Sequence, residues 1–144
     1  MKKKILITTG GSGGHVLPAI TIYDHLKVKY DVLISTDLRG HKYLDSDIYK
    51  VFVVNTPRLN KLILLPFAII KVFFLTLKSL FLLKREKIEI LISTGGYMSL
   101  PLCLAAKMRN IKIFLLEPNM IIGRANRFFL NFCEKIICYD SNVI

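Results

Sequence analysis

The sequence is poor in the residues that build zinc sites and disulfide frameworks. It has three cysteines, at positions 103, 133 and 138, and none of them forms a CxxC pair or stands beside a histidine. A structural zinc site therefore has little support. Cys133 and Cys138 lie in an apolar run, FCEKIICY, which predicts buried thiols. Free, buried thiols fit a reducing, cytoplasmic compartment.

The N-terminus lacks the long apolar run of a secretory signal. MKKKILITTGG starts with lysines, but glycines interrupt its apolar stretch early. A signal peptide needs roughly 7–15 apolar residues and a small-residue cleavage site. We therefore interpret residues 4–8 as a first β-strand. No internal repeat or low-complexity linker divides the chain, which is long enough for one domain with a hydrophobic core.

Acidic residues are also scarce, with 10 Asp and Glu against 21 Lys and Arg, a formal net charge of +11. Such an excess attracts an anionic partner, which could be nucleic acid, acidic lipid or a phosphorylated substrate. A general lysine bias is the alternative explanation. The basic residues flank apolar stretches and do not interleave with aromatic residues, so nucleic acid is the least favoured partner.

Short apolar segments alternate with helical segments along the whole chain. The predicted strands are 4–8, 31–35, 51–54, 88–93, 111–116 and 135–139; the predicted helices are 15–30, 99–109 and 122–132, with a loop and short helix over 36–50 and a long apolar segment over 60–85. This alternation predicts a parallel sheet covered on both faces. The expected fold class is α/β, a Rossmann-like doubly wound parallel sheet.

The loop after the first strand is unusually rich in glycine. TTGGSGGHVLP, residues 8–18, has four glycines in five positions. They let the backbone approach a ligand closely, and the helix that follows offers free N–H groups to an anion. A tight turn without a ligand is the structural alternative. The spacing is neither GxGxxG closed by an acid after the second strand nor a GK[ST] loop, so a nicotinamide-dinucleotide site is less favoured and a Walker loop is excluded.

His15 directly follows this loop, at the predicted start of a helix and at the carboxyl end of a strand. Ligands of doubly wound sheets gather at that edge. A neutral imidazole there could take a proton from a sugar hydroxyl, so His15 is the candidate catalytic base. A purely structural histidine is the alternative. His25 and His41 have no such context and are interpreted as surface residues.

Two further loops follow the fourth and fifth predicted strands. STGGYMSLP, residues 93–101, has two glycines before a helix that Pro101 opens. LLEPNMIIGRANR, residues 115–127, places Glu117 and Asn119 at the same edge of the sheet. These two side chains could instead cap the helix that follows.

The segment 61–85 is long, apolar and basic. Lys71, Lys78 and Arg85 recur every seven residues, with Thr76 and Ser79 nearby, which leaves a narrow polar stripe and a wide apolar face on a helix. A transmembrane helix would have the required length, but two lysines inside it are costly, and it would separate neighbouring strands of one sheet. A wholly buried core helix is a second alternative.

We favour a helix, or a helix pair broken at Pro66, that packs on the sheet and lies against the membrane surface. The residues expected to face the membrane are Phe73, Leu77, Leu80, Lys71 and Lys78, and the flanking basic residues are Lys61, Lys84, Arg85 and Lys87. These cations would attract an anionic lipid surface.

Four segments together resemble the undecaprenyl-diphospho-muramoylpentapeptide N-acetylglucosaminyltransferases of glycosyltransferase family 28. They are GGSGGHVLPA at 10–19, GGYMSLP at 95–101, LEPN at 116–119 and GRANR at 123–127. The resemblance covers essentially the whole chain but only the first half of the family's usual length. The chain departs from the family at Leu116 and Pro118, often His and Gln, and at Leu100, often Gly.

The resemblance implies a two-domain GT-B enzyme, of which residues 1–144 are the acceptor-binding, membrane-associating N-terminal domain. It implies inverting transfer of N-acetylglucosamine from UDP-N-acetylglucosamine to the undecaprenyl-diphosphate-linked muramoyl-pentapeptide of peptidoglycan synthesis. The site is expected at the cytoplasmic face of the plasma membrane, with no cofactor and no obligatory metal. The donor-binding domain would be supplied in cis or in trans, which leaves this chain inactive alone. A non-catalytic, membrane-recruiting subunit of a split two-chain enzyme is the alternative.

The resemblance also assigns roles to individual residues. His15 matches the proposed base. Ser12, Gly13, Gly14 and Asn119 match donor-contacting positions, and Gly95, Gly96 and Tyr97 match a second glycine loop thought to receive the acceptor diphosphate. Glu117 of the third motif is retained and is expected to bind substrate.

Overall fold

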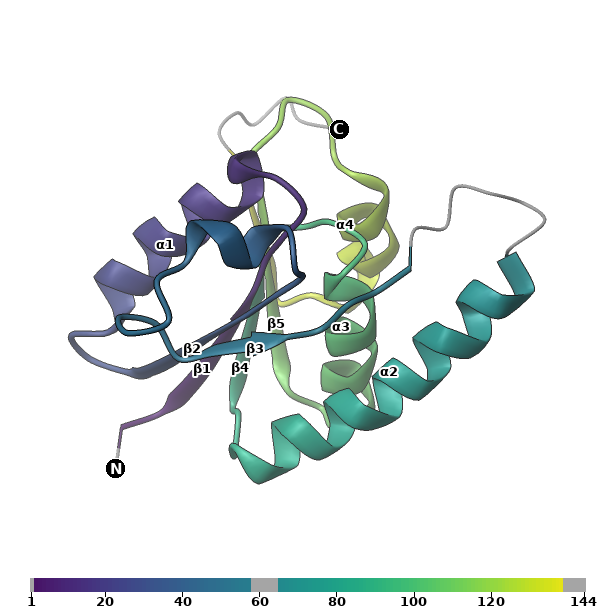
Figure 1. The fold of residues 1–144 in the computed structure, drawn as a ribbon, viewed down its shortest axis with the longest axis horizontal. Helices are drawn as coiled ribbons and strands as arrows, with labels where there is room; N and C mark the ends of the chain where they lie inside the picture. Colours follow the sequence, from purple (N-terminus) through teal and green to yellow (C-terminus); the bar gives the residue numbers. More distant parts are fainter. Residues whose placement is uncertain (1, 58–64, 139–144) are drawn as a thin grey trace.

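A computed structural model describes residues 2–57 and 65–138 of the chain. Six parallel strands form one sheet, in the order β3-β2-β1-β4-β5-β6 (Figure 1). The strands are β1 (Lys4–Thr8), β2 (Asp31–Thr36), β3 (Val51–Val53), β4 (Ile90–Ser93), β5 (Lys112–Glu117) and β6 (Lys135–Cys138). The α/β fold class with a doubly wound parallel sheet is confirmed.

Helices flank the sheet, with α1 on one side and α3 and α4 on the other, and α2 lies outside α3 (Figure 1). Their bounds are α1 (Gly13–Leu26), α2 (Leu65–Arg85), α3 (Ser99–Met108) and α4 (Arg124–Phe129), with short 3₁₀ turns η1 (Gly40–Tyr43) and η3 (Leu130–Phe132). The first helix is shorter at its end than predicted, because the chain turns after Lys27 toward β2. Residue 139 of the last predicted strand lies outside the described residues.

Alternate residues of β1 build the two halves of the core. Ile5 and Ile7 pack with Ala19 of α1, whereas Leu6 faces the opposite side and packs with Leu102 of α3. All five side chains are almost completely buried. Since successive strand residues point to opposite faces, a continuous apolar run is what a strand between two helix layers requires.

The long crossover through α2 decides which loops meet. The chain builds β1, β2 and β3 in one direction across the sheet, and α2 then returns it to the other side of β1. There β4 pairs with β1, from Ile5↔Ile90 to Thr8↔Ser93. This pairing puts the topological switch point between β1 and β4, and the loops after these two strands become neighbours at the carboxyl edge.

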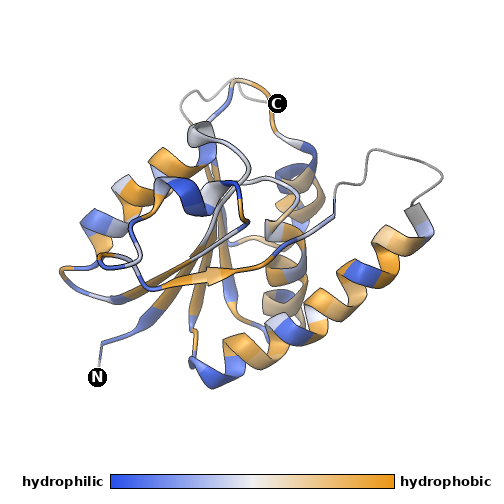
Figure 2. Cartoon of the chain, viewed as in Figure 1, coloured by the Kyte–Doolittle hydropathy of each residue, from blue (hydrophilic) through white to orange (hydrophobic). Residues whose placement is uncertain are grey.

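Helix α2 packs on the domain through a narrow face of mostly small or short side chains. Its buried residues are Ala68, Val72, Thr76, Ser79 and Leu83. Opposite them, large apolar side chains are exposed: Phe67, Ile69, Ile70, Phe73, Phe74, Leu77 and Phe81. Figure 2 shows α2 coloured mainly as hydrophobic, interrupted by hydrophilic positions. The small Ala105 and Ala106 are completely buried in α3, the helix against which α2 packs.

The structure corrects one expectation for this segment and bears on another. Leu80, predicted to face the membrane, is partly buried and packs against the core cluster that includes Leu6 and Leu102. The alternative of a single helix fits the described part, because α2 is continuous from Leu65 with Pro66 in its first turn, where proline is tolerated. Residues 61–64, on which a helix pair broken at Pro66 depends, lie outside the described part. Lys71 and Lys78 are exposed as expected.

By length and composition, Pro66–Arg85 could cross a membrane. Only 28% of its most apolar stretch is buried within the domain, so the alternative of a wholly buried core helix is wrong.

Candidate functional site

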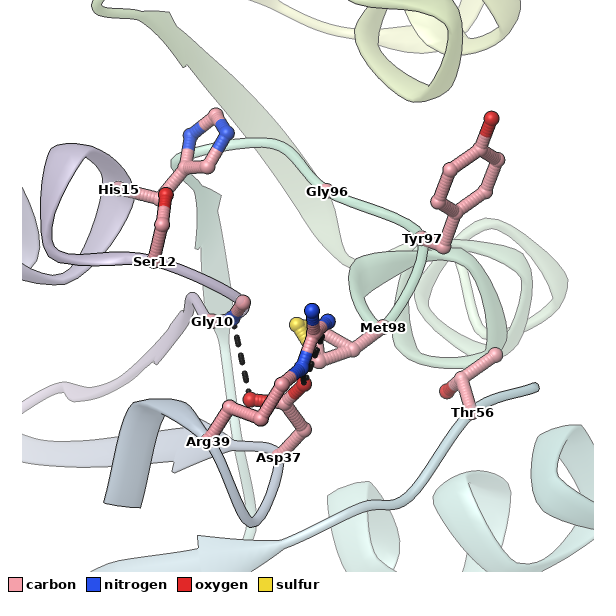
Figure 3. A pocket seen from close by; sticks show the side chains of 10 residues that line it. Gly10, Ser12, His15, Asp37, Arg39, Thr56, Gly96, Tyr97 and Met98 are labelled. Atoms are coloured by element: carbon pink, nitrogen blue, oxygen red, sulfur yellow. Dashed lines mark hydrogen bonds and ion pairs between the residues drawn. The ribbon is translucent and has the colours of Figure 1, made fainter. Parts of the chain in front are cut away.

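Two adjoining cavities open at the carboxyl edge of the sheet. The first, of about 470 Å³, is lined by Gly10, Gly11, Ser12, His15, Asp37, Arg39, Thr56, Gly96, Tyr97 and Met98 (Figure 3). The second, of about 280 Å³, is lined by His15, Gly95, Gly96, Tyr97, Glu117, Asn119, Gly123, Arg124 and Ala125. His15, Gly96 and Tyr97 belong to both linings, so the two cavities meet at these residues. All three predicted loops contribute to the site.

The first glycine loop leads directly into α1. Gly11 has φ +86°, a left-handed conformation that favours glycine. Ser12 is the N-cap but makes no side-chain capping bond, and the first turn holds no acidic residue, so the positive end of the helix has no counter-charge of its own. Gly13 and Gly14 form this first turn; they do not line either cavity, and Gly13 lies beside the Tyr43 ring.

His15 links the first loop to the second. Its Nδ1 lies 2.7 Å from the carbonyl oxygen of Thr94, which precedes the two glycines of the second loop. A carbonyl can only accept, so Nδ1 carries the proton of this bond. The neutral ring therefore has its free lone pair on Nε2. Because the bond joins residues 79 apart in the sequence, it exists only when β1 and β4 are paired.

The second glycine loop needs both of its glycines. Gly95 and Gly96 have φ +90° and +88°. A Cβ on Gly95 would lie 3.2 Å from Nδ2 of Asn126 and 3.5 Å from Cε1 of His15. The Ser99 hydroxyl donates to the Gly96 carbonyl at 2.7 Å and so ties the loop to α3. Tyr97, between them, lines both cavities.

Glu117 organises the third loop from inside. The residue is 1% exposed, and its carboxylate accepts four hydrogen bonds. The donors are the Asn119 N–H at 3.2 Å, Asn119 Nδ2 at 2.9 Å, the Gly123 N–H at 2.8 Å and Asn126 Nδ2 at 3.1 Å. The capping alternative is partly right, since Gly123 immediately precedes α4. Asn119 is exposed at the second cavity, with its Nδ2 already engaged.

Sequence reasoning did not single out five residues that line the two cavities or support them: Asp37, Arg39, Thr56, Arg124 and Asn126. Asp37 directly follows β2, just as the three predicted loops directly follow their own strands. Asn126 is 1% exposed, and its Nδ2 donates to Glu117 and to the Leu116 carbonyl. The GRANR motif contains Arg124 and Asn126, but nothing in the sequence alone shows that α4 turns the asparagine inward.

Hydrogen bonds from the protein stabilise the ionised carboxylate of Asp37. Burial raises the pKa of Asp37, but hydrogen bonds from the N–H groups of Gly40 and Gly11 and from Arg39 outweigh burial and bring its pKa below the ordinary value. The carboxylate is therefore ionised at neutral pH.

Within residues 2–57 and 65–138, no three His, Cys, Asp or Glu side chains are grouped to hold a metal ion. The expected absence of a catalytic metal stays a prediction. Two buried polar atoms near the cavities, Thr56 Oγ1 and Asn126 Oδ1, have no hydrogen-bond partner among the described residues. Thr56 belongs to the lining of the first cavity.

Comparison with known proteins gives consistent matches over most of the chain. A model of the glycosyltransferase family 28 N-terminal domain matches residues 5–138. A Pelagibacter ubique protein named UDP-N-acetylglucosamine–N-acetylmuramyl-(pentapeptide) pyrophosphoryl-undecaprenol N-acetylglucosamine transferase is 52% identical, over 99% of this chain and 40% of its own length.

Two solved structures share the fold. The crystal structure of Acinetobacter baumannii MurG matches with a TM-score of 0.86 at 21% identity, over 99% of this chain and 43% of that one. A UDP-N-acetylglucosamine 2-epimerase matches with a TM-score of 0.61 at 17% identity, over 81% of this chain and 33% of that one. At these identities the likeness shows the fold alone. The chain thus spans about two fifths of the Pelagibacter relative's length.

Proposed function

The chain belongs to glycosyltransferase family 28, and from this premise we propose that it is the acceptor-binding half of an N-acetylglucosaminyltransferase of peptidoglycan synthesis. The proposed reaction transfers N-acetylglucosamine from UDP-N-acetylglucosamine to the undecaprenyl-diphosphate-linked muramoyl-pentapeptide. The name of the Pelagibacter relative supports both substrates. Because the chain spans about 40% of that relative, the proposal assigns most of the donor site to a second domain, in cis or in a partner chain.

The observation that carries the proposal is the position and tautomer of His15. The ring lies where the two cavities meet, and its bond to Thr94 leaves Nε2 as the acceptor. In the proposed step, Nε2 takes the proton of an acceptor hydroxyl while that oxygen attacks the anomeric carbon of the donor. The bond from this carbon to UDP breaks, its electron pair leaves with UDP, and the configuration inverts.

The remaining predicted residues would bind or shape substrate around this step. We assign Gly95, Gly96 and Tyr97 to the acceptor, since they line the space beside His15. Ser12, Gly13, Gly14 and Asn119 are assigned to the donor, with Gly13 and Gly14 acting through the start of α1. Glu117 is assigned an indirect role, because all four of its hydrogen bonds go to the protein.

We further propose that α2 holds the domain on the cytoplasmic face of the plasma membrane. Phe67, Phe73 and Phe81 are 74%, 60% and 76% exposed. A helix with such an apolar face and exposed lysines fits the interface of an anionic bilayer. A lipid-linked acceptor would then reach the enzyme from the surface on which the helix lies.

The test uses the complete enzyme with both domains. In His15→Ala, kcat should fall by about 10²–10⁴, the usual contribution of a general base. The acceptor KM should change much less, because the interaction is made in the transition state. The matched control is His25→Ala, an exposed histidine of the same helix, which should retain the wild-type rate. Steady-state kinetics with UDP-N-acetylglucosamine and lipid-linked acceptor measure both constants.

His15→Gln separates a base from a positioning group. Glutamine keeps a donor for Thr94 but cannot take a proton near neutral pH. A rate as low as that of His15→Ala supports the base. A rate near that of the wild type would assign the base to another residue, and unchanged kinetics in both variants would remove His15 from the site.

A further inference from the structure

Arg39 brings a positive charge into the first cavity. It follows β2 by three residues, its side chain is 52% exposed, and it extends between the first glycine loop and Met98 (Figure 3). A Cβ on Gly11 would lie 3.4 Å from its Nη2, so the guanidinium lies directly against the loop backbone. The cation therefore borders the same space as Ser12, His15 and Tyr97.

The buried carboxylate of Asp37 fixes this guanidinium. Asp37 Oδ2 accepts from Arg39 Nε at 3.1 Å and pairs with Nη2 at 3.0 Å, while Oδ1 accepts from the N–H groups of Gly11 at 3.0 Å and Gly40 at 2.8 Å. The Asp37 side chain is only 8% exposed. One carboxylate thus ties the arginine to the glycine loop. A guanidinium already held in place loses less conformational entropy when a ligand binds.

The outer edge of the guanidinium is available to a ligand. Arginine has five N–H donors, and Asp37 engages two of them, the one on Nε and one on Nη2. Within the described residues, the N–H groups of Nη1 have no acceptor, and no acidic residue other than Asp37 lines the first cavity. The start of α1, with no acidic side chain in its first turn, adds further positive potential. The cavity is therefore suited to an anionic oxygen.

We propose that Arg39 is a positioning residue that binds an anionic oxygen of the acceptor in the first cavity, with Asp37 as its anchor. The inference rests on the proposed function, which supplies an acceptor with two kinds of oxyanion, the diphosphate and the peptide carboxylates. A guanidinium binds either through two parallel N–H···O bonds. The bond would hold the acceptor in the cavity that His15 borders.

The test is acceptor kinetics of the complete enzyme carrying Arg39→Gln or Arg39→Lys. Arg39→Gln should raise the acceptor KM by at least about tenfold, as expected for a charge-assisted bond, and change the donor KM and kcat by less than about threefold. Arg39→Lys should recover part of the loss, since it restores the charge but not the planar fork. The control Arg109→Gln removes the same charge from an exposed arginine just after α3, at the opposite end of the sheet.

Two soluble inhibitors identify the oxyanion. A short-chain prenyl diphosphate and a muramoyl-pentapeptide without diphosphate are titrated against wild-type enzyme and Arg39→Gln by calorimetry, a readout independent of turnover. Weaker binding of the diphosphate alone assigns Arg39 to phosphate, and weaker binding of the peptide alone assigns it to carboxylate. Unchanged binding of both, or a rise in the donor KM in place of the acceptor KM, overturns the proposal.

The two proposals fail separately. A complete enzyme that transfers no sugar contradicts the proposed function, while calorimetry still reports on Arg39. An active enzyme whose acceptor KM is unaffected by Arg39→Gln contradicts only the role of Arg39. Circular dichroism melting of each variant guards against unfolding; if Arg39→Gln is unfolded, Arg39→Lys alone must show a raised acceptor KM, and wild-type values there overturn the proposal.

Discussion

The carboxyl edge of the sheet and the outer face of α2 are built on opposite principles. At the edge, polar atoms are fixed by specific partners, such as His15 on Thr94 and Glu117 on Gly123. On the outer face of α2, Phe73 and Phe81 project into solvent. Function at the edge therefore depends on a few distances and directions, whereas function on α2 depends on the total apolar area and charge presented.

The same difference is visible in what each region buries. The edge buries charged and amide groups, namely Asp37, Glu117 and Asn126. Hydrogen bonds compensate both carboxylates and the Asn126 Nδ2 group. Helix α2 buries Ala68 and Thr76 and leaves its largest side chains outside. In ordinary core packing the largest apolar side chains are the buried ones, because their burial is the main stabilising contribution to folding. The exposed face is thus better explained by an external apolar partner than by folding.

The largest effect is expected where one edge residue holds several others. Glu117→Ala removes the acceptor of four hydrogen bonds and leaves one buried N–H of Asn126 without that partner, whereas the other donors belong to the exposed residues Asn119 and Gly123. We expect the free energy of unfolding to fall by about 3 kcal/mol, on the scale of one unsatisfied buried group together with three lost hydrogen bonds. Urea unfolding of the chain measures it. Glu117→Gln keeps one acceptor oxygen and should lose less; equal loss in both variants would show that charge, not bond geometry, matters here.

An intermediate effect is expected on α2, without loss of stability. Phe73→Glu combined with Phe81→Glu should weaken binding to anionic vesicles by at least roughly 100-fold, since each phenylalanine that inserts into the bilayer contributes about 1.5–3 kcal/mol. The unfolding free energy should stay unchanged because both rings are exposed. Vesicle sedimentation at two salt concentrations measures binding, which should weaken with salt as the lysines are screened.

Two controls sharpen this test of α2. Val28→Glu places the same charge on a residue that is 71% exposed just beyond α1 and should leave vesicle binding intact. Leu80→Glu should instead destabilise the fold, because Leu80 packs against the core. Vesicle binding that survives the double substitution would exclude α2 as the membrane contact.

The smallest effect is expected from pH at the edge. Because the folded-state pKa of Asp37 lies below its ordinary value of 3.8, its ionised form stabilises the fold above that pH. This contribution is lost as the pH falls through the lowered pKa, so stability should decline in the acid range and not near neutrality. Asp37→Asn keeps an acceptor oxygen but cannot titrate. Its free energy of unfolding, measured from pH 6 to about pH 2, should therefore fall less steeply with decreasing pH than that of the wild type. If the free energy of unfolding of the variant falls as steeply as that of the wild type, the decline belongs to other carboxylates.

The local pattern of the sequence predicted most of the secondary structure and the motif-bearing loops. Apolar runs bounded by glycine or polar residues predicted all six strands within a few residues, since strand formation between two helix layers leaves a direct mark on hydropathy. Errors at helix ends, as at residues 27–30, arise because capping and turn geometry depend on the next element. The site positions of Asp37, Arg39 and Asn126 were missed because single polar residues carry no periodic signal.

By itself, the sequence determined the alternating α/β pattern, the glycine loops at the strand ends and the family, because these features are encoded by neighbouring residues. Only the tertiary structure decided that β4 lies against β1, so that His15 reaches Thr94, and that Asp37 draws Arg39 to the first glycine loop. It also decided that Leu80 turns inward while Phe81 faces outward. Strand order and helix rotation are set by contacts between residues far apart in the chain, which local periodicity does not specify.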